Sequence, residues 1–389
     1  MQIQTRHIDS TLLAHFKKNM QIMILLGPRQ AGKTTLITRL FPDAQYFLVD
    51  NEPILKNLET YDIHTYRQII RPDTKTLIID EIQLLSNPGR CAKIIHDQLP
   101  DIQLIITGSS ALTIKNKTSE SLAGRKVEYH LYPLTFSEYL YQKNSTDALL
   151  YTVLNKILAG VGQKDAHLFD LTATLETFLL FGGYPYLIQN PQDVVYLDNL
   201  VDSVVFKDIL ELELIENRKD ALNLLKLLAH QMSNLINYAE LANRLQIDVR
   251  TVKKYIEIFE QSFIIFRLYP FSKNKRDEIV KSPKIYFFDT GLRNALIKDF
   301  SDLLLRTDRG ALFENLIVSE VFKSNHYRDH SVNLNYWRTK QGAEIDLVLS
   351  GKDLLIGVEI KYGTGTATKV FKNRYTDAKV FEVTAENFY

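Results

Sequence analysis

The sequence predicts an α/β protein with a parallel sheet in its N-terminal part, a helical middle and a second, smaller α/β region at its C-terminal end. Short apolar runs alternate with stretches at helical spacing, and the runs are residues 21–26, 46–50, 76–80 and 104–108. Runs of this kind are typical of a parallel sheet that is buried on both faces. A fifth run, at 126–134, alternates between apolar and polar residues and is expected to add a strand.

Composition limits the class of protein. A chain of 389 residues exceeds one comfortable core, so two to four domains are expected. With 47 basic and 46 acidic residues the net charge is +1, so any nucleic-acid binding must come from a local patch. The single cysteine, Cys91, excludes an intramolecular disulfide and a cysteine-based zinc site. The start lacks a signal-like apolar run and no later run is long enough to span a membrane, so we expect a soluble, cytoplasmic protein.

The loop after the first strand has the chemistry of a phosphate site. GPRQAGKT, at 27–34, fits the pattern G-x-x-x-x-G-K-[ST] between a predicted strand and a predicted helix. Lys33 would reach the β- and γ-phosphates, and the Thr34 hydroxyl would bind Mg²⁺. The residues expected to surround the phosphates are Gly27, Pro28, Arg29, Gln30, Ala31, Gly32, Lys33, Thr34 and Thr35.

Polar residues at the ends of later strands complete this site. Asp80 would hold Mg²⁺ through water, and Glu81 would orient or deprotonate the attacking water, although the pair could also be a solvated turn that starts a helix. Ser109, or alternatively Thr107, is placed to sense the γ-phosphate, unless it only caps a helix.

Hydrolysis usually also requires a positive charge beside the transferred phosphate. Arg125 would supply it within the chain or from a neighbouring subunit, and the alternative is a surface ion pair. Arg29, within the loop, is a second candidate for this charge.

The middle of the chain is expected to be helical from 136 to 230, with a break at FGGYP, 181–185. After it, two helices separated near 246–248 and two extended runs follow the winged-helix order. The second helix is expected at 249–261. Its basic or polar residues that could contact phosphates or bases are Arg250, Thr251, Lys253 and Lys254. Alternatively, the module could be only a structural adaptor.

The C-terminal region has acids and a lysine on two predicted strands, 344–349 and 354–361, which are expected to close the chain. Alternate residues share a face, so Glu359 lies with Lys361 and Glu344 lies with Asp346. The short turn between the strands would bring Asp346 near Glu359.

A preceding helix, 311–323, would add Glu314 as a third carboxylate for Mg²⁺ or Mn²⁺, with Lys361 helping to activate water. The alternatives are a nuclease-like fold that does not cleave, or surface charge. Arg338, Lys340 and Gln341 could contact phosphates.

Several motifs together resemble bacterial and archaeal AAA-type ATPases that carry a C-terminal DUF4143 region. They are GPRQAGKTTL, LIIDEIQ, LIITGSSA, LAGRKVEYHLYPLTFSEYL, FGGYPY, FFDTGLRN, GALFENLIVSEV, YWRTKQGAEIDLVL and VEIKYG, and they run from about residue 20 to 365. The resemblance implies an additional-strand, AAA+-like fold and adenine rather than guanine nucleotides. Lys33, Asp80 and Glu81 match the positions of the family motifs.

The tail also resembles the PD-(D/E)xK, restriction-endonuclease-like superfamily, although Ile345 stands where that pattern has proline. The expected domains are therefore an ATPase core at 1–145, a helical lid at 146–225, a winged helix at 226–295 and a nuclease-like domain at 296–389. The expected function is Mg²⁺-dependent ATP hydrolysis with a tail that acts on DNA. The alternatives are a nucleotide-switched binding or scaffold protein whose tail holds a protein partner without cleavage, and a nucleic-acid-stimulated ATPase with a degenerate tail. A homo-oligomer is compatible with each of them.

Overall fold

The computed structural model describes residues 5–109, 122–143, 148–160, 171–203, 215–272, 282–328, 331–363 and 369–389. The chain divides into two compact units. The first unit lies within residues 1–132 and includes 261–263, and the second holds 133–260 and 264–389. None of the helices in the described ranges is long and apolar enough to cross a membrane.

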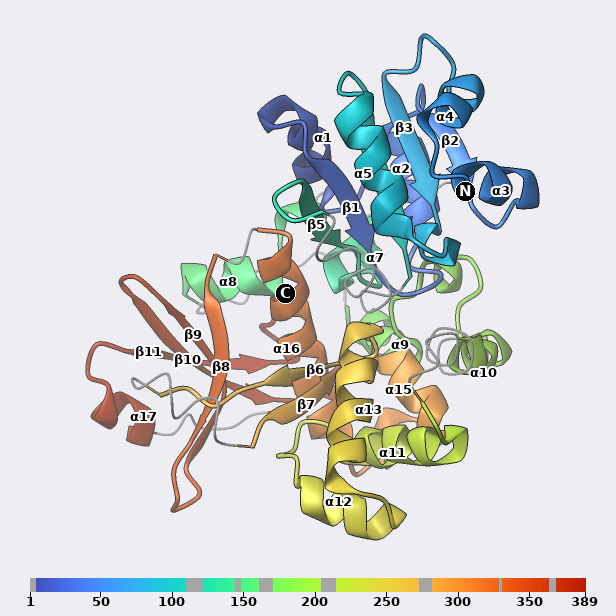
Figure 1. Cartoon of the computed structure of the whole chain (residues 1–389). Coiled ribbons are helices and arrows are strands. Elements are labelled where there is room, and N and C mark those ends of the chain that lie inside the picture. The colour runs from blue at the N-terminus through green and yellow to red at the C-terminus, as the bar shows by residue number, and fades with distance from the viewer. Residues whose placement is uncertain are drawn as a thin grey trace. The chain divides into compact units, whose positions relative to one another are not determined.

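The first unit is built on a five-stranded parallel sheet with the order β2-β3-β4-β1-β5 (Figure 1). The strands are β1 (Ile22–Leu26), β2 (Gln45–Leu48), β3 (Thr76–Asp80), β4 (Gln103–Gly108) and β5 (Lys126–His130). All five residues of β1 are buried, as the continuous apolar run predicts. Because β4 lies between β1 and β3, the sheet has the additional strand that the resemblance implied.

The helices of the first unit connect these strands. They are α1 (Asp9–Lys18), α2 (Lys33–Leu40), α3 (Glu52–Leu58), α4 (Ile63–Ile69) and α5 (Pro88–Gln98), with a 3₁₀ turn, η1 (Ile82–Leu84). The side chains of Asp62 and Asn87 accept backbone N–H groups and so cap α4 and α5. Helix α2 instead starts after a glycine, Gly32, and has no side-chain cap. Gly32 therefore offers no side chain to accept the first N–H groups of α2.

The second unit confirms the predicted helical middle within the described ranges. Its first helices are α7 (Phe136–Gln142), α8 (Val153–Ala159), α9 (Thr172–Phe181), α10 (Val194–Asp202) and α11 (Arg218–His230), with the 3₁₀ turns η2 (Ala148–Leu150) and η3 (Pro185–Ile188). The break at FGGYP falls between α9 and η3, as predicted.

Two helices and a two-stranded antiparallel sheet follow in the predicted order. They are α12 (Tyr238–Leu245), α13 (Val249–Gln261), β6 (Ile265–Leu268) and β7 (Lys284–Phe287). Just beyond β6, Phe271 donates its backbone N–H to Tyr336 in the C-terminal sheet at 2.5 Å. The backbone of this hairpin therefore continues into the next sheet.

The C-terminal part of this unit is a four-stranded sheet with helices around it. The helices and turns are α15 (Thr290–Ile297), η5 (Leu303–Leu305), α16 (Arg309–His326) and α17 (Lys369–Arg374), and the strands are β8 (Asn333–Arg338), β9 (Glu344–Gly351), β10 (Leu354–Lys361) and β11 (Lys379–Thr384). The sheet order is β11-β10-β9-β8. The expectation that β10 closes the chain was wrong, because β11 pairs with it in parallel. Strand β11 is only partly buried and carries charges, so its apolar signal is weak.

Two of the glycine-containing motifs, FGGYP and FFDTGLRN, fold against each other inside the second unit. The Asp289 carboxylate caps α15 by accepting the N–H of Leu292 at 2.9 Å, and it also accepts the N–H of Gly183 at 2.7 Å. A side chain at Gly182 would overlap the Asp289 carboxylate, and one at Gly291 would overlap the Phe181 carbonyl. Both glycines are therefore required by close packing.

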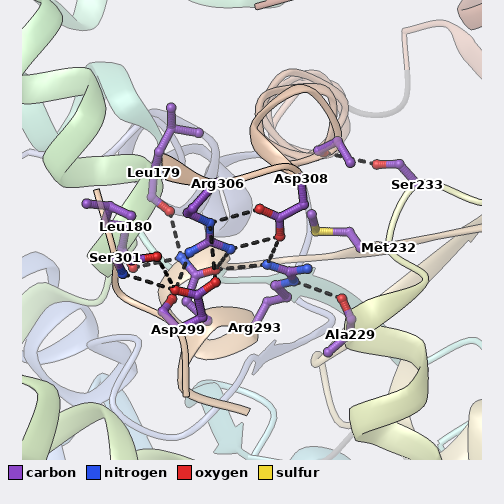
Figure 2. Close-up of polar contacts among 12 residues, drawn as sticks. Leu179, Leu180, Ala229, Met232, Ser233, Arg293, Asp299, Ser301, Arg306 and Asp308 are labelled. Atoms are coloured by element: carbon purple, nitrogen blue, oxygen red, sulfur yellow. Dashed lines mark hydrogen bonds and ion pairs between the residues drawn. The ribbon is translucent and has the colours of Figure 1, made fainter. Parts of the chain in front are cut away.

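A buried group of charges fixes the turn between α15 and α16. Figure 2 shows Asp308 between Arg293 and Arg306, and its carboxylate accepts from them at 2.6 and 2.8 Å. Arg293 also donates to the Ala229 carbonyl at 2.8 Å. Burial alone would raise the pKa of Asp308, but the two guanidinium groups lower it to about 2. This group is a structural support within the unit.

Candidate functional site

The predicted phosphate loop connects the buried end of β1 to the start of α2. A side chain at Gly27 would overlap the Leu131 carbonyl, so only glycine fits at the first position of the loop. Gly32 has a φ of 94°, which an L-residue rarely adopts. The buried Lys33 ammonium donates to the carbonyls of Gly27 and Pro28 at 2.8 and 3.0 Å. The lysine is thus held over the loop from which it would reach a phosphate.

Asp80 lies at the end of β3, where three hydroxyl groups meet its carboxylate. Thr34 donates to one carboxylate oxygen at 2.6 Å, and the Tyr46 hydroxyl donates to the same oxygen at 2.5 Å. Thr107, at the end of β4, donates to the other oxygen. Asp80 is 1% exposed, so the three hydroxyls compensate for the loss of water around a buried carboxylate. The structure therefore brings together the two residues, Thr34 and Asp80, that were predicted to hold Mg²⁺.

The contact with Tyr46 was missed by the sequence analysis. Tyr46 lies on β2, beside β3 in the sheet, where Leu48 pairs with Asp80. Burial and the neighbouring carboxylate raise the pKa of the Tyr46 phenol, so it stays a hydrogen-bond donor. The only signal in the sequence is an aromatic residue near the end of the strand that precedes the acid.

Glu81 and Ser109 also meet at this edge of the sheet. Glu81 has a φ of 58°, and its backbone N–H donates to the Thr107 hydroxyl at 3.3 Å. The Gln83 amide donates both to the Glu81 carboxylate and, at 3.3 Å, to the Ser109 hydroxyl. Ser109 is thus linked to Glu81, whereas the alternative sensor, Thr107, is used to hold Asp80.

Arg6 is a second residue that sequence reasoning missed. It is 2% exposed, and its guanidinium donates to the carbonyl of Ala31 in the loop at 3.4 Å and to that of Tyr132 at 2.8 Å. It thereby ties the phosphate loop to the chain that leaves β5. A lone arginine ahead of α1 has no local pattern that would reveal this role.

The structure does not support a role for Arg125 at the phosphates within its own chain. Arg125 directly precedes β5, and its carbonyl accepts from Ile22 at the start of β1. The phosphate loop follows the other end of β1, so the length of the strand separates the two. The Arg125 side chain forms an ion pair with Asp97 at 2.9 Å. The contact observed for Arg125 is therefore the surface ion pair, which was one of the alternatives. Arg29, the second candidate, lies half-buried within the phosphate loop itself.

These residues suit a magnesium–nucleotide complex. The donor set at one edge of the sheet comprises an ammonium group, uncapped N–H groups of α2, a hydroxyl and a carboxylate. Oxygen ligands and one or two carboxylates are what Mg²⁺ uses when it binds together with phosphates. When bound, the ion would neutralise phosphate charge, and Thr34 and Asp80 would hold it.

The acids of the C-terminal region surround a buried lysine that the sequence analysis did not include. The Lys284 ammonium, on β7, lies 3.1 Å from Glu314, 2.5 Å from Glu344 and 3.8 Å from Asp346. We call these four residues the Lys284 centre. Burial would lower the pKa of Lys284, but the three carboxylates raise it, so the lysine stays charged.

Glu314 is set apart from the other acids by its environment. The hydroxyl of Tyr286 donates to Glu314 at 2.8 Å, and Lys284 contacts the same oxygen. Burial raises the pKa of Glu314 to about 7, against the opposing effect of Lys284. Burial therefore favours the protonated form of Glu314.

The predicted hairpin between β9 and β10 is confirmed. The register ends with Val358 paired with Leu347, and Glu359 and Asp346 are the residues next to that pair. Asp346 accepts the backbone N–H of Ile360 at 2.8 Å.

The predicted three-carboxylate metal site is not supported. Within the described ranges no group of three or more His, Cys, Asp or Glu side chains is arranged to hold a metal ion. Glu359 is buried and Lys361 is exposed, whereas Glu314 and Asp346 contact the ammonium of Lys284. Two of the three acids predicted to bind a metal therefore contact a lysine that is distant in sequence.

The basic residues proposed for nucleic-acid contact lie on exposed positions. Arg250, Lys253 and Lys254 of α13 are exposed, and Lys254 pairs with Glu216 at 3.5 Å. Arg338 pairs with Glu344 at 3.4 Å. Contact between α13 and nucleic acid therefore stays a prediction.

Comparisons with known proteins agree with parts of this description. Residues 19–140 match the family model described as "AAA domain", and 309–386 match "Domain of unknown function (DUF4143)". Residues 172–303 match "Domain of unknown function (DUF8612)". The AAA-domain match covers the phosphate loop, Asp80 and Glu81, and the DUF4143 match covers the three acids of the Lys284 centre.

Similar proteins occur in archaea and bacteria. Uncharacterized protein MJ1637 of Methanocaldococcus jannaschii is 26% identical over 376 residues, which cover 91% of this chain and 78% of that protein. An uncharacterized protein of Haemophilus influenzae is 24% identical and covers 90% and 84% of the two chains. The solved Walker-type ATPase PABY2304 of Pyrococcus abyssi matches 76% of this chain and 96% of its own, with 14% identity and a TM-score of 0.49. By these family matches, residues 19–140 are similar to an AAA domain and residues 309–386 to the DUF4143 domain.

Proposed function

We propose that the protein binds ATP with Mg²⁺ and hydrolyses it. The observation that carries this proposal is the 2.6 Å hydrogen bond between Thr34 and Asp80. Thr34 follows the phosphate-loop lysine after β1, and Asp80 ends β3, which β4 separates from β1 in the sheet. That contact joins the loop to the acid that a magnesium–nucleotide site requires. The match of residues 19–140 to the AAA domain supports the same chemistry.

The residues divide the chemistry between them. Lys33 and the N–H groups at the start of α2 would bind the phosphates, and Asp80 would accept hydrogen bonds from water bound to Mg²⁺. Glu81 would orient the attacking water and take its proton. The water oxygen bonds to the γ-phosphorus, while the bond from that phosphorus to the bridging oxygen breaks and its electrons leave with ADP.

Phosphate release from ATP tests this proposal. The wild type is expected to release phosphate only with Mg²⁺, and K33A is expected to lose both tight ATP binding and turnover. K361A, which changes a lysine in the second unit, is the matched control and is expected to keep full turnover. Turnover of K33A at the wild-type rate would contradict the proposal.

For the C-terminal region, we propose the second reading of the sequence: recognition of a partner without cleavage. The Lys284 centre supports it, because the ammonium lies beside Glu314 and Asp346, two of the three acids that the metal-dependent nuclease would need. The competing proposal, a deoxyribonuclease using Mg²⁺ or Mn²⁺, predicts nicking of supercoiled DNA.

The two readings are separated by incubating wild type and D346N with supercoiled, linear and single-stranded DNA and either metal. We expect no cutting by either protein. Metal-dependent cutting by the wild type that D346N loses would favour the nuclease.

A further inference from the structure

We propose that Gln83 is a positioning residue for ATP hydrolysis, which links Ser109 to the carboxylate of Glu81. This inference rests on the proposed ATPase function and adds a residue that the phosphate-loop chemistry does not itself require. Gln83 lies in η1, directly after the acid pair, and is 9% exposed. Its side chain contacts both the expected water-orienting residue, Glu81, and the expected γ-phosphate sensor, Ser109.

The contacts of the Gln83 amide show how the link is made. Its nitrogen donates to one oxygen of Glu81 and, at 3.3 Å, to the hydroxyl of Ser109. A carboxylate can use two oxygens, so Gln83 holds one and leaves the other to accept a hydrogen from water. The amide therefore limits the rotation of Glu81 in the direction that matters for orienting water.

The backbone around the acid pair supports this arrangement. Glu81 adopts a left-handed conformation, with a φ of 58°, and its N–H donates to Thr107 on β4. This bend lets the chain turn into η1 directly after the strand, so that Gln83, two residues later, reaches back to Glu81. A left-handed conformation at a residue other than glycine is uncommon and often marks a functional site.

A buried polar atom of Gln83 gives a second, independent observation. The side-chain oxygen of Gln83 has no hydrogen-bond partner among the described residues, although it is buried. Buried polar atoms in proteins are nearly always satisfied, either by protein or by ordered water. An acceptor beside the Glu81 carboxylate and the Ser109 hydroxyl is suited to a second hydrogen bond from the attacking water.

The link also gives Ser109 a way to affect hydrolysis. A γ-phosphate that accepted a hydrogen bond from the Ser109 hydroxyl would turn that hydroxyl toward the phosphate. The Gln83 amide, which contacts both residues, would then shift and reorient the Glu81 carboxylate. The arrangement thus joins the sensing of phosphate to the alignment of the general base. ATP binding itself uses the phosphate loop, so it is expected not to depend on Gln83.

The test compares wild type, Q83L, S109A and the double variant. Leucine has a volume close to that of glutamine and removes both the donor and the buried acceptor. We expect Q83L to lower kcat at least tenfold while the Kd for ATP, measured by equilibrium titration, stays within about twofold. We expect S109A to lower kcat less, and the double variant to be no slower than Q83L, because both residues act through one link.

The outcomes are distinct. A structural role alone would lower the Tm and weaken ATP binding, and its effects would multiply with those of S109A; that result would overturn the proposal. Unchanged kcat in Q83L would overturn it while leaving the ATPase function in place. A wild-type protein that does not hydrolyse ATP would overturn both the ATPase function and the role of Gln83, and the wild type alone shows that result.

Discussion

At the scale of single residues, the buried and half-buried acids of this protein are compensated in different ways. Asp80 is held by hydroxyl groups, whereas Asp308 is held by two arginines. Glu320 has weaker compensation: one of its oxygens accepts the N–H of Phe136 at 2.9 Å, and the other lies 3.8 Å from Lys323 and has no hydrogen-bond partner among the described residues. Burial raises the pKa of Glu320 from 4.5 to about 7, with Lys323 opposing the shift.

The raised pKa of Glu320 predicts a pH-dependent stability. The folded state binds the proton more tightly than the unfolded state, so this stabilisation is complete below about pH 4.5 and is lost as the pH rises through about 7. Each unit of pKa difference corresponds to about 1.4 kcal/mol, so the effect is a few kcal/mol at most. The isosteric variant E320Q, which can still accept the Phe136 N–H, is expected to show a smaller loss of stability over this range.

Urea unfolding of both proteins at about pH 5 and about pH 8 measures the difference. Other acids, Glu314 among them, contribute equally to both proteins and cancel in the comparison. Identical pH dependence in wild type and E320Q would show that Glu320 does not titrate in this range.

Residues that act within a continuous motif could be predicted from the sequence, and residues brought in from elsewhere could not. Lys33, Thr34 and Asp80 follow from spacing and from the rule that parallel strands end at one edge of a sheet. Tyr46 and Lys284 come from separate elements, and their contacts depend on strand order and on packing between segments distant in sequence. For the same reason the acids at 314 and 346 were assigned to a metal, although their neighbour is an ammonium group.

At the scale of elements, the second unit depends on the close contact between the ends of α9 and α15. Asp289 joins the two motifs, and Asn294 donates to the carbonyls of Leu179 and Leu180 at 3.0 and 2.9 Å. The end of α9 therefore has its carbonyls satisfied by a side chain of α15. The sequence showed only that FGGYP interrupts a helix; the partner of the turn could not be predicted from local pattern.

The close approach at Gly291 predicts a large effect of a single methyl group. In G291A the new Cβ would overlap the Phe181 carbonyl, so α15 must move away from α9. We expect a loss of about 1–3 kcal/mol or more, as for other overpacked sites. The matched control is G310A in α16, where a Cβ has open space and alanine favours the helix.

Thermal unfolding of the two alanine variants checks this prediction. The Tm of G291A should fall by several degrees, and that of G310A should stay the same or rise. Equal Tm values for the two variants would show that the backbone at Gly291 can move without cost.

At the scale of the whole molecule, each compact unit has its own polar centre. The first holds the phosphate loop and Asp80 at one edge of a parallel sheet, and the second holds the Lys284 centre. The ammonium, hydroxyl and carboxylate groups of the first centre suit nucleotide chemistry. The paired charges of the second centre suit a structural role or the recognition of a partner. We propose that the first centre hydrolyses ATP.

The most direct test is the initial rate of phosphate release at saturating Mg²⁺ and ATP by wild type and E81Q, with ATP binding measured on the same samples. Glutamine keeps the shape of Glu81 but cannot take a proton from water. We expect steady turnover by the wild type and at least a hundredfold lower rate in E81Q, with ATP bound equally well. Absence of wild-type turnover despite bound ATP, or equal rates in the two proteins, would contradict it.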